Sequence, residues 1–443
     1  MANDKDFVVN GPVSVGKDTK VTVGSIAAGA VDLSTGNYFT DTPTGDYTYT
    51  FANPGDVQAF QIEATGGSAA VASTFSTTLY TGNGTTQTID NGLDLSGDGG
   101  LVWLKWRSGA VGSGAHVLVD TERGINYWLS SSTTSAQNTT QNSVTAFNSN
   151  GFSIVDAGGK TNYSGDNYVS WSFKKQTKFF DIVTYTGDGV AGREIAHNLG
   201  SVPGMVMVKR TDASTIWPVY HTGVNGGTNS ENYILYINGT ASQIDNNTYW
   251  NDTAPTDSVF TIGTNTNVNA SGGTYVAYLF AHDTASDGLI QCGSYTGNGS
   301  TTGPEINLGW QPQWLLVKNA SASANWVLLD TVRGMPSAGS NQHTLLADST
   351  AAELVNTAYQ VQPLAGGFQP VSTNGLVNAS GNNYIYMAIR SASAPAITWP
   401  TNIEWPAGIT PSTPAEGETD VYTFTTDDGG TTYTGIQSID NAS

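Results

Sequence analysis

The sequence predicts an all-β protein built from repeated domains, and three observations support this prediction. A turn signature, Tyr-Thr-Gly followed by Asn or Asp and a second Gly, begins at Tyr80, Tyr185 and Tyr295, so it recurs about every 105 to 110 residues, a length that suits a whole domain. Charged residues make up only 12% of the chain and glycines number 52, a composition that favours strands and tight turns over helices. Apolar residues alternate with polar ones in many segments, whereas few segments show the spacing of an amphipathic helix.

Two further landmarks follow each turn signature in the same order. About twenty residues later comes an apolar strand that ends in a lysine, and near the end of each unit an Asn-x-Ser-Gly motif precedes an aromatic strand. The lysines are Lys105, Lys209 and Lys318, and the motifs begin at Asn162, Asn269 and Asn378. This repetition predicts three tandem β-sandwich domains, at residues 71–178, 179–286 and 287–394.

The two chain ends contain further strand patterns outside the array. Alternating valines broken by Gly and Pro predict that residues 1–30 form an extended arm that pairs with something else, such as a neighbouring subunit. Residues 31–70 contain period-2 strands with a turn at 53–56. Residues 395–443 contain edge-type strands stopped by Pro400 and Pro406, then a predicted hairpin whose turn is at 427–430.

Segments 31–70 and 395–443 resemble, taken together, a β-domain of tail-fibre and other virion structural proteins of marine phages, cyanophages especially. In that family the matching pieces are consecutive, whereas here the whole array separates them. The resemblance implies one discontinuous terminal domain with the three repeats inserted into it, and the alternative is two unrelated small modules. The matching residues are Asp32 to Asn37, Thr50 to Pro54, Thr398 to Pro400, Glu404 to Pro406 and Asp420 to Gly430.

The array also resembles a domain, mostly of unassigned function, in the same phage proteins. The motifs that carry this resemblance are those described above together with Asp-Thr-x-Arg-Gly. That element is complete in the first repeat from Asp120 and in the third from Asp330, whereas the second has Tyr220-His221-Thr222-Gly223 at this place. A jelly-roll or lectin-like sandwich is the expected architecture of each repeat.

The Asp-Thr-x-Arg-Gly element is the most enzyme-like feature of the sequence. A glycosidase needs two carboxylates that flank one bond, but no second carboxylate recurs, since Glu122 of the first repeat is Val332 in the third. We therefore expect the pairs Asp120–Arg123 and Asp330–Arg333 to hold a turn through a charge-assisted hydrogen bond. An ion or sugar contact is the alternative, and we do not expect the protein to be an enzyme.

Aromatic residues of the divergent second repeat provide the better candidates for ligand binding. They lie in loop-like surroundings rich in Asn and Asp, where flat aromatic faces and amides are typical of saccharide recognition. Core packing or a subunit interface is the alternative interpretation. The candidates are Trp217, Tyr220, His221, Tyr249 and Trp250, whereas Trp103, Trp106, Trp171 and Trp314 are expected in the core because they occupy repeated strands.

Composition argues against several classes of partner. The net charge of −20 would repel nucleic-acid phosphates. The single cysteine, Cys292, excludes an intrachain disulfide framework, and the five histidines lack ligand-like spacing, so no metal or cofactor is expected. No apolar run reaches the roughly 20 residues that span a bilayer, so we expect no membrane insertion. The N-terminus does not resemble a signal peptide, so we expect the protein to be made in a cytoplasm.

The phage resemblance implies a virion structural protein, a tail-fibre or spike subunit that attaches to a host cell-surface glycan or protein without catalysis. It further implies a homotrimer held through the terminal domain, contacts with other tail or capsid proteins, and a place on the virion surface after assembly in the host cytoplasm. A capsid decoration or head-fibre protein is one alternative. A polysaccharide depolymerase tailspike is another.

Overall fold

The computed structural model describes most of the array and the strands of the chain ends. The predicted arm up to residue 22 and the predicted turns at 53–56 and 427–430 lie outside the described residues. Those described are 23–27, 30–33, 38–41, 47–48, 50–52, 59–65, 71–111, 114–140, 143–285, 287–335, 341–391, 397–408, 410–411, 419–426 and 431–442.

The chain folds into two compact units, one made of both chain ends (1–69 and 393–443) and one made of residues 70–392. In the terminal unit both ends share one sheet, because β6 (Ala59–Thr65) pairs antiparallel with β33 (Thr419–Thr425). The fold class predicted from the sequence is therefore confirmed: an all-β chain with the repeats inserted into a discontinuous β-domain.

The terminal unit is a mixed sheet in the order β32-β34-β33-β6-β3-β1-β2-β5. Strand β1 lies within the segment expected to be an extended arm, but it pairs in parallel with β3 of the same chain. A buried aromatic cluster with Phe60 stacked on Phe424 joins the two ends. The strands are β1 (Val23–Ala27), β2 (Ala30–Asp32), β3 (Tyr38–Asp41), β4 (Tyr47–Thr48), β5 (Thr50–Ala52), β31 (Ile397–Thr398), β32 (Ile403–Glu404) and β34 (Tyr433–Ala442), with a 3₁₀ turn, η3 (Pro406–Gly408).

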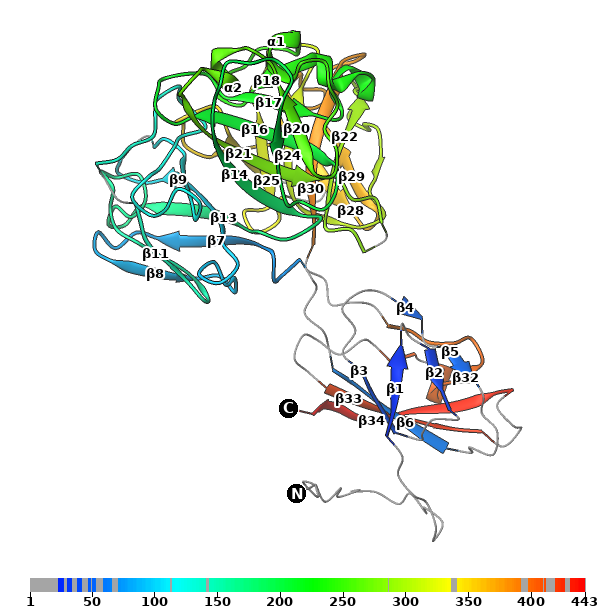
Figure 1. The fold of residues 1–443 in the computed structure, drawn as a ribbon. Helices are drawn as coiled ribbons and strands as arrows, with labels where there is room; N and C mark the ends of the chain where they lie inside the picture. The colour runs from blue at the N-terminus through cyan, green and yellow to red at the C-terminus, as the bar shows by residue number, and fades with distance from the viewer. Residues whose placement is uncertain are drawn as a thin grey trace. The chain divides into compact units, whose positions relative to one another are not determined.

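Each repeat has a larger antiparallel sheet with four equivalent strands and a smaller sheet beside it (Figure 1). In the first repeat the order is β10-β9-β13-β7, and in the others β17-β16-β21-β14 and β25-β24-β30-β22. The first repeat contains β7 (Phe75–Thr81), β8 (Gln87–Asp90), β9 (Gly100–Ser108), β10 (Val117–Asp120), β11 (Val144–Asn148), β12 (Gly151–Ile154) and β13 (Asn167–Lys174).

The second and third repeats extend the larger sheet by two strands. The second repeat contains β14 (Phe180–Thr186), β15 (Arg193–Ala196), β16 (Pro203–Arg210), β17 (Pro218–His221), η1 (Val224–Gly227), η2 (Ser230–Asn232), β18 (Tyr233–Tyr236), β19 (Ile244–Asp245), α1 (Asn247–Trp250), β20 (Val259–Ile262), α2 (Thr266–Asn269) and β21 (Thr274–Ala281). The third contains β22 (Ile290–Thr296), β23 (Ile306–Asn307), β24 (Pro312–Asn319), β25 (Val327–Asp330), β26 (Gln342–Leu346), β27 (Leu354–Asn356), β28 (Val361–Leu364), β29 (Gly367–Pro370) and β30 (Asn383–Arg390).

Apolar side chains from both sheets fill the core of each repeat. In the third repeat, Val317 and Leu329 of the larger sheet share one buried cluster with Ile306 and Phe368 of the smaller sheet. The tryptophans of the repeated strands are buried, as predicted, with Trp103, Trp106, Trp171 and Trp314 at most 2% exposed. Burial of such large aromatic side chains is a main source of stability for these sandwiches.

The three repeats join into one compact unit rather than a string of separate domains. Aromatic rings of all three repeats meet where Phe173 contacts Phe280 of the second repeat and Trp314 of the third, with ring centroids 5.5 and 5.9 Å apart. The second repeat packs on the first, the third on the second, and the first on the third, through the hydrogen bonds described below. The repeats therefore form a closed ring.

Candidate functional site

The two most conspicuous repeated motifs bind each other within every repeat. In the third repeat, the backbone N–H of Asn298 donates to Oδ1 of Asn378 at 2.9 Å, and Nδ2 of Asn378 donates back to Asn298 Oδ1 at 3.0 Å and to the Ser300 carbonyl at 2.8 Å. Asn162 and Asn269 make the matching contacts in the other repeats. All three asparagine side chains are fully buried. We call this pair of motifs a clasp, and it holds the fold of each repeat.

The tyrosine that opens each turn signature is also structural. Its ring stacks on a tyrosine of the neighbouring strand at 5.0 to 5.2 Å, and its hydroxyl donates to a backbone carbonyl at 2.6 to 2.8 Å. The stacked pairs are Tyr80–Tyr168, Tyr185–Tyr275 and Tyr295–Tyr384. These contacts explain why the motif recurs without any need for a ligand.

The repeated lysines join the repeats into the ring. Each Nζ atom donates to a carbonyl of its own repeat and to one of the preceding repeat in the ring. Lys105 reaches Ala351 (2.9 Å), Lys209 reaches Thr134 (2.9 Å), and Lys318 reaches Thr240 (3.2 Å). We number the junctions by the repeat that supplies the carbonyl, so Lys209 lies at the first junction, Lys318 at the second and Lys105 at the third.

All three lysine side chains are fully buried. Burial lowers the pKa of Lys105 from 10.5 to about 7, and it lowers the pKa values of Lys209 and Lys318 to about 8. Their partners at these distances are neutral carbonyls, which an uncharged amine can also use as acceptors. We therefore expect the stability of the ring to depend on the protonation of these groups at neutral and mildly alkaline pH.

The Asp-Thr-x-Arg-Gly turns have the geometry expected from their spacing. Asp120 accepts a hydrogen bond from the backbone N–H of Arg123 at 2.8 Å and another from its Nε at 2.6 Å, and Asp330 and Arg333 repeat both distances. Each aspartate also accepts a bond from the next repeat: Asp120 from the Tyr278 hydroxyl and Asp330 from the Trp171 indole. The aspartates therefore hold both a turn and a junction.

The surroundings of the two arginines differ at the Nη1 atom. At the third junction, Arg333 Nη1 lies 3.1 Å from Glu353, which also pairs with Arg107 of the first repeat at 2.7 Å and with His343 at 2.9 Å. At the first junction, the contact of Arg123 Nη1 among the described residues is the amide oxygen of Gln137 at 3.5 Å.

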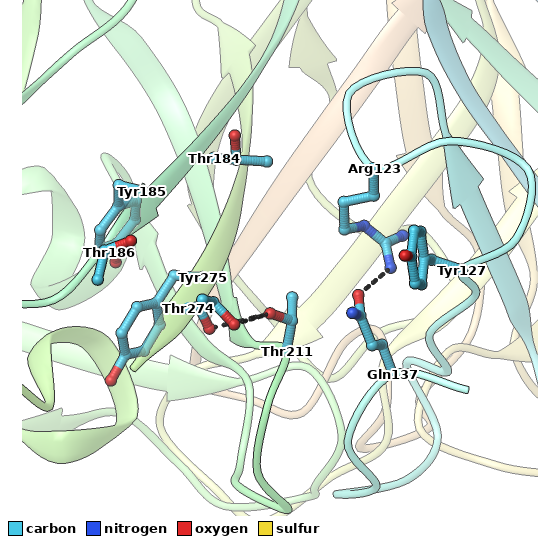
Figure 2. Close-up of a pocket in the computed structure, with 9 residues that line it drawn as sticks. All are labelled: Arg123, Tyr127, Gln137, Thr184, Tyr185, Thr186, Thr211, Thr274 and Tyr275. Carbon is cyan, nitrogen blue, oxygen red and sulfur yellow. Dashed lines mark hydrogen bonds between the residues drawn. The ribbon is translucent and has the colours of Figure 1, made fainter. Parts of the chain in front are cut away.

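A cavity of about 360 Å³ lies at the first junction, next to Arg123 (Figure 2). Figure 2 shows Arg123, Tyr127 and Gln137 of the first repeat gathered on one side, with threonines and tyrosines of the second repeat opposite them. The lining is polar and carries hydroxyl, amide and guanidinium groups. Its residues are Arg123, Tyr127, Gln137, Thr184, Tyr185, Thr186, Thr211, Thr274 and Tyr275.

The five aromatic candidates of the second repeat do not line this cavity, and they do not face solvent. Trp217, Tyr220, His221, Tyr249 and Trp250 are at most 5% exposed, which agrees with the packing alternative and corrects the expectation of exposed loop residues. The gap beside Tyr220 and Trp250 measures only about 10 Å³, far smaller than a sugar ring.

Local structure explains this burial. Asn246 caps α1 by accepting a hydrogen bond from the Thr248 N–H at 3.0 Å, which is the preferred role of Asn at a helix start. The resulting turn directs Tyr249 and Trp250 inward, and the Trp250 indole donates to the Tyr233 carbonyl at 3.1 Å. The Asn-rich segment is thus a helix cap rather than an exposed loop.

His221 occupies the position of the two aspartates in the second repeat and also serves a junction. Its Nδ1 accepts from the Gly223 N–H at 3.0 Å, so its Nε2 donates to the Tyr386 carbonyl of the third repeat at 3.0 Å. Burial lowers the pKa of His221 to about 3, so its imidazole stays neutral at physiological pH. The described residues contain no cluster of His, Cys, Asp and Glu able to hold a metal ion.

Most cavity residues were not among the sequence candidates. Arg123 was proposed as a turn residue, whereas Tyr127, Gln137 and Thr211 carry no motif. The available signal was the repeated lysine: Gln137 lies three residues after the carbonyl of Thr134 that Lys209 contacts. That signal can be interpreted only once the ring of repeats is known.

No helix among the described residues is long and apolar enough to cross a membrane. A search of curated proteins found no match to the chain. Residues 71–393, which include all three repeats, match the family described as "Domain of unknown function (DUF7483)". The match covers well over half of the 443 residues, and the chain belongs to this family.

Proposed function

We propose that the protein is a bacteriophage virion structural protein, a tail-fibre or spike subunit that presents the ring of repeats for attachment to a glycan on the host cell surface. The proposal assigns mounting on the particle to the terminal unit and recognition to the ring. The phage assignment rests on the resemblance of the two chain ends to tail-fibre domains.

The observation that carries the proposal is the division of the chain into two compact units. Both chain ends belong to the terminal unit, and the ring is a separate compact unit inserted between them. An inserted unit of this kind can serve recognition, while the unit made of both chain ends serves oligomerisation and anchoring. Weak sites displayed by several chains on one particle gain avidity without any catalysis.

A non-catalytic role is supported by the use made of the repeated motifs. Their buried polar groups are engaged in clasps, turns and junctions, and no pair of described carboxylates recurs in every repeat. An appendage of this kind depends on rigidity and display rather than on a reactive group.

The experiment that tests the function is antibody labelling of intact particles of the encoding phage in the electron microscope. We expect label on tail fibres or spikes. Label spread over the head would favour a capsid decoration protein, and absence of label from intact particles would contradict a virion role. A parallel incubation with host envelope polysaccharide should release no new reducing ends, because their release would identify a depolymerase.

A further inference from the structure

We propose that the cavity at the first junction binds one neutral sugar residue through Arg123, Tyr127 and Gln137 together with the threonine hydroxyls opposite them. This inference rests on the proposed attachment function and specifies where the glycan lies. The argument comes from a comparison of the three junctions within the same chain.

The three junctions share one backbone framework. At the first junction, the Gln137 N–H donates to the Thr211 carbonyl at 2.9 Å; at the second, Gln243 donates to Ala320 at 2.8 Å; at the third, Glu353 donates to Arg107 at 2.9 Å. Each of these donors lies three residues after a carbonyl contacted by a ring lysine, Thr134, Thr240 or Thr350. The positions are therefore structurally equivalent.

At the third junction, charged side chains of the protein itself occupy the positions that correspond to the cavity. Arg107 binds Glu353 through three hydrogen bonds of 2.7 to 3.1 Å, and Arg333 binds the same carboxylate from the other side. At the first junction the equivalent positions hold the shorter Thr211 and the neutral Gln137. The arginine corresponding to Arg333 is retained as Arg123, and the space beside it is the cavity of about 360 Å³.

The charge of the site favours a neutral ligand. Arg123 is already paired with Asp120 at 2.6 Å, and the first junction has lost the acidic and the basic residue of the third junction together. A carboxylate ligand would add an uncompensated charge to a protein whose net charge is −20. A hydroxylated neutral molecule adds none.

The groups on the wall match sugar hydroxyls. Arg123 Nη1 makes only a 3.5 Å contact to Gln137, and a hydrogen bond of that length is weak, so the guanidinium retains donor capacity. The Gln137 amide can donate or accept, and the Thr211 and Thr274 hydroxyls, which hydrogen-bond each other at 2.6 Å, keep acceptor capacity. Tyr127 is half-buried and adds an aromatic side chain to the lining. The volume lies at the lower end of the roughly 300–1,000 Å³ typical of small-ligand sites.

The test uses the full chain and saturation-transfer NMR with a panel of methyl glycosides: glucoside, galactoside, mannoside, N-acetylglucosaminide and glucuronide. We expect at least one neutral glycoside to bind. The double variant Gln137→Glu/Thr211→Arg, which copies the third junction, should weaken that binding at least tenfold. Gln243→Glu, the equivalent acidic change at the second junction, should leave it unchanged.

A second variant, Tyr127→Ala, keeps the test valid if the double variant does not fold, and it should also weaken binding. Neutral glycoside binding that survives both variants would place the sugar site elsewhere and overturn this inference, while leaving attachment through glycans intact. Binding of the glucuronide alone, or of no glycoside, would also overturn it. Virion labelling is independent of all these results, so failure of this site and failure of the proposed function are distinguishable.

Discussion

The Nζ atom of Lys105 lies 2.9 Å from the carbonyl oxygen of Ala351, and this contact closes the ring between the first and third repeats. Lys105 also donates to the Thr350 carbonyl at 3.2 Å, and Lys209 and Lys318 make the contacts equivalent to that one at the other junctions. A buried ammonium group is costly because it loses its hydration. Each lysine offsets part of that cost with several carbonyl hydrogen bonds.

The stability of the ring should therefore rise with pH above about 7. In the unfolded chain these lysines titrate near 10.5, whereas in the folded chain their pKa values are about 7 and 8. Between these values the unfolded state binds more protons, so raising the pH favours the folded state. Scanning calorimetry should show a Tm that increases from pH 7 to pH 9, and Lys105→Met should reduce the increase. Lys178→Met, at an exposed lysine, is the control, and an equal pH response in both variants would contradict the prediction.

Replacing Asn378 by Ala should destabilise the third repeat by about 3 kcal/mol, because it removes a fully buried side chain and leaves part-buried backbone groups of the turn signature without this partner. The side chain accounts for three hydrogen bonds of 2.8 to 3.0 Å. Denaturant unfolding measures the change, with Asn126→Ala at an exposed position as the control. A loss below about 0.5 kcal/mol, the range of ordinary surface substitutions, would show that the clasp is not needed.

A methyl group on the third residue of the turn signature should also be harmful. A Cβ atom on Gly187 would lie 2.2 Å from the Ala270 carbonyl oxygen, whereas one on Gly239 would meet nothing within 4 Å. Because the obstacle is backbone rather than a movable side chain, Gly187→Ala should lower the Tm by several degrees while Gly239→Ala leaves it nearly unchanged. Calorimetry of both variants provides the comparison, and equal Tm values would mean that the two motifs approach each other less closely than described.

The sequence allowed the fold to be predicted because its signals are local. Turn signatures and period-2 strands depend on neighbouring residues, so the repeats and the buried Trp103 and Trp314 could be predicted correctly. The ring could not, because Lys105 finds its partner Ala351 far along the chain. A lysine that recurs within an apolar strand was the available sign of a buried, hydrogen-bonded amine.

The candidate site was harder to predict for a related reason. Trp250 lies among Asn and Asp residues, which are typical of exposed loops, but the same residues also cap helices, and only the folded chain decides between the two. Arg123 and Arg333 lie in the same motif, and their difference depends on Gln137 and Glu353, which belong to no motif. The differences between the junctions therefore depend on residues that do not repeat.

The carboxylate of Glu353 should make the third junction acid-labile. Burial raises the pKa of Glu353, but hydrogen bonds from Arg107 and the charge of Arg333 outweigh burial and hold it below 4.5. A depressed pKa contributes stability above the unfolded value that is lost as pH falls through the folded value. Glu353→Gln should cost about 3 kcal/mol at pH 7, with a gap to wild type that narrows below pH 4.5. Denaturant unfolding at pH 7 and below pH 4.5 tests this prediction, with Glu305→Gln at an exposed site as the control. A difference in unfolding free energy from wild type that stays constant with pH would contradict it.

The oligomeric state should depend on the terminal unit and not on the ring. Within the ring, each repeat already uses its junction surface to bind the next repeat, so the threefold arrangement closes inside one chain. We therefore expect the contacts of the proposed homotrimer to come from the terminal unit. Light scattering of the full chain should give three times its 46.4 kDa, and a truncated chain of residues 71–391 should be monomeric. A monomeric full chain would refute the trimer, and a trimeric truncated chain would assign trimerisation to the outer surface of the ring.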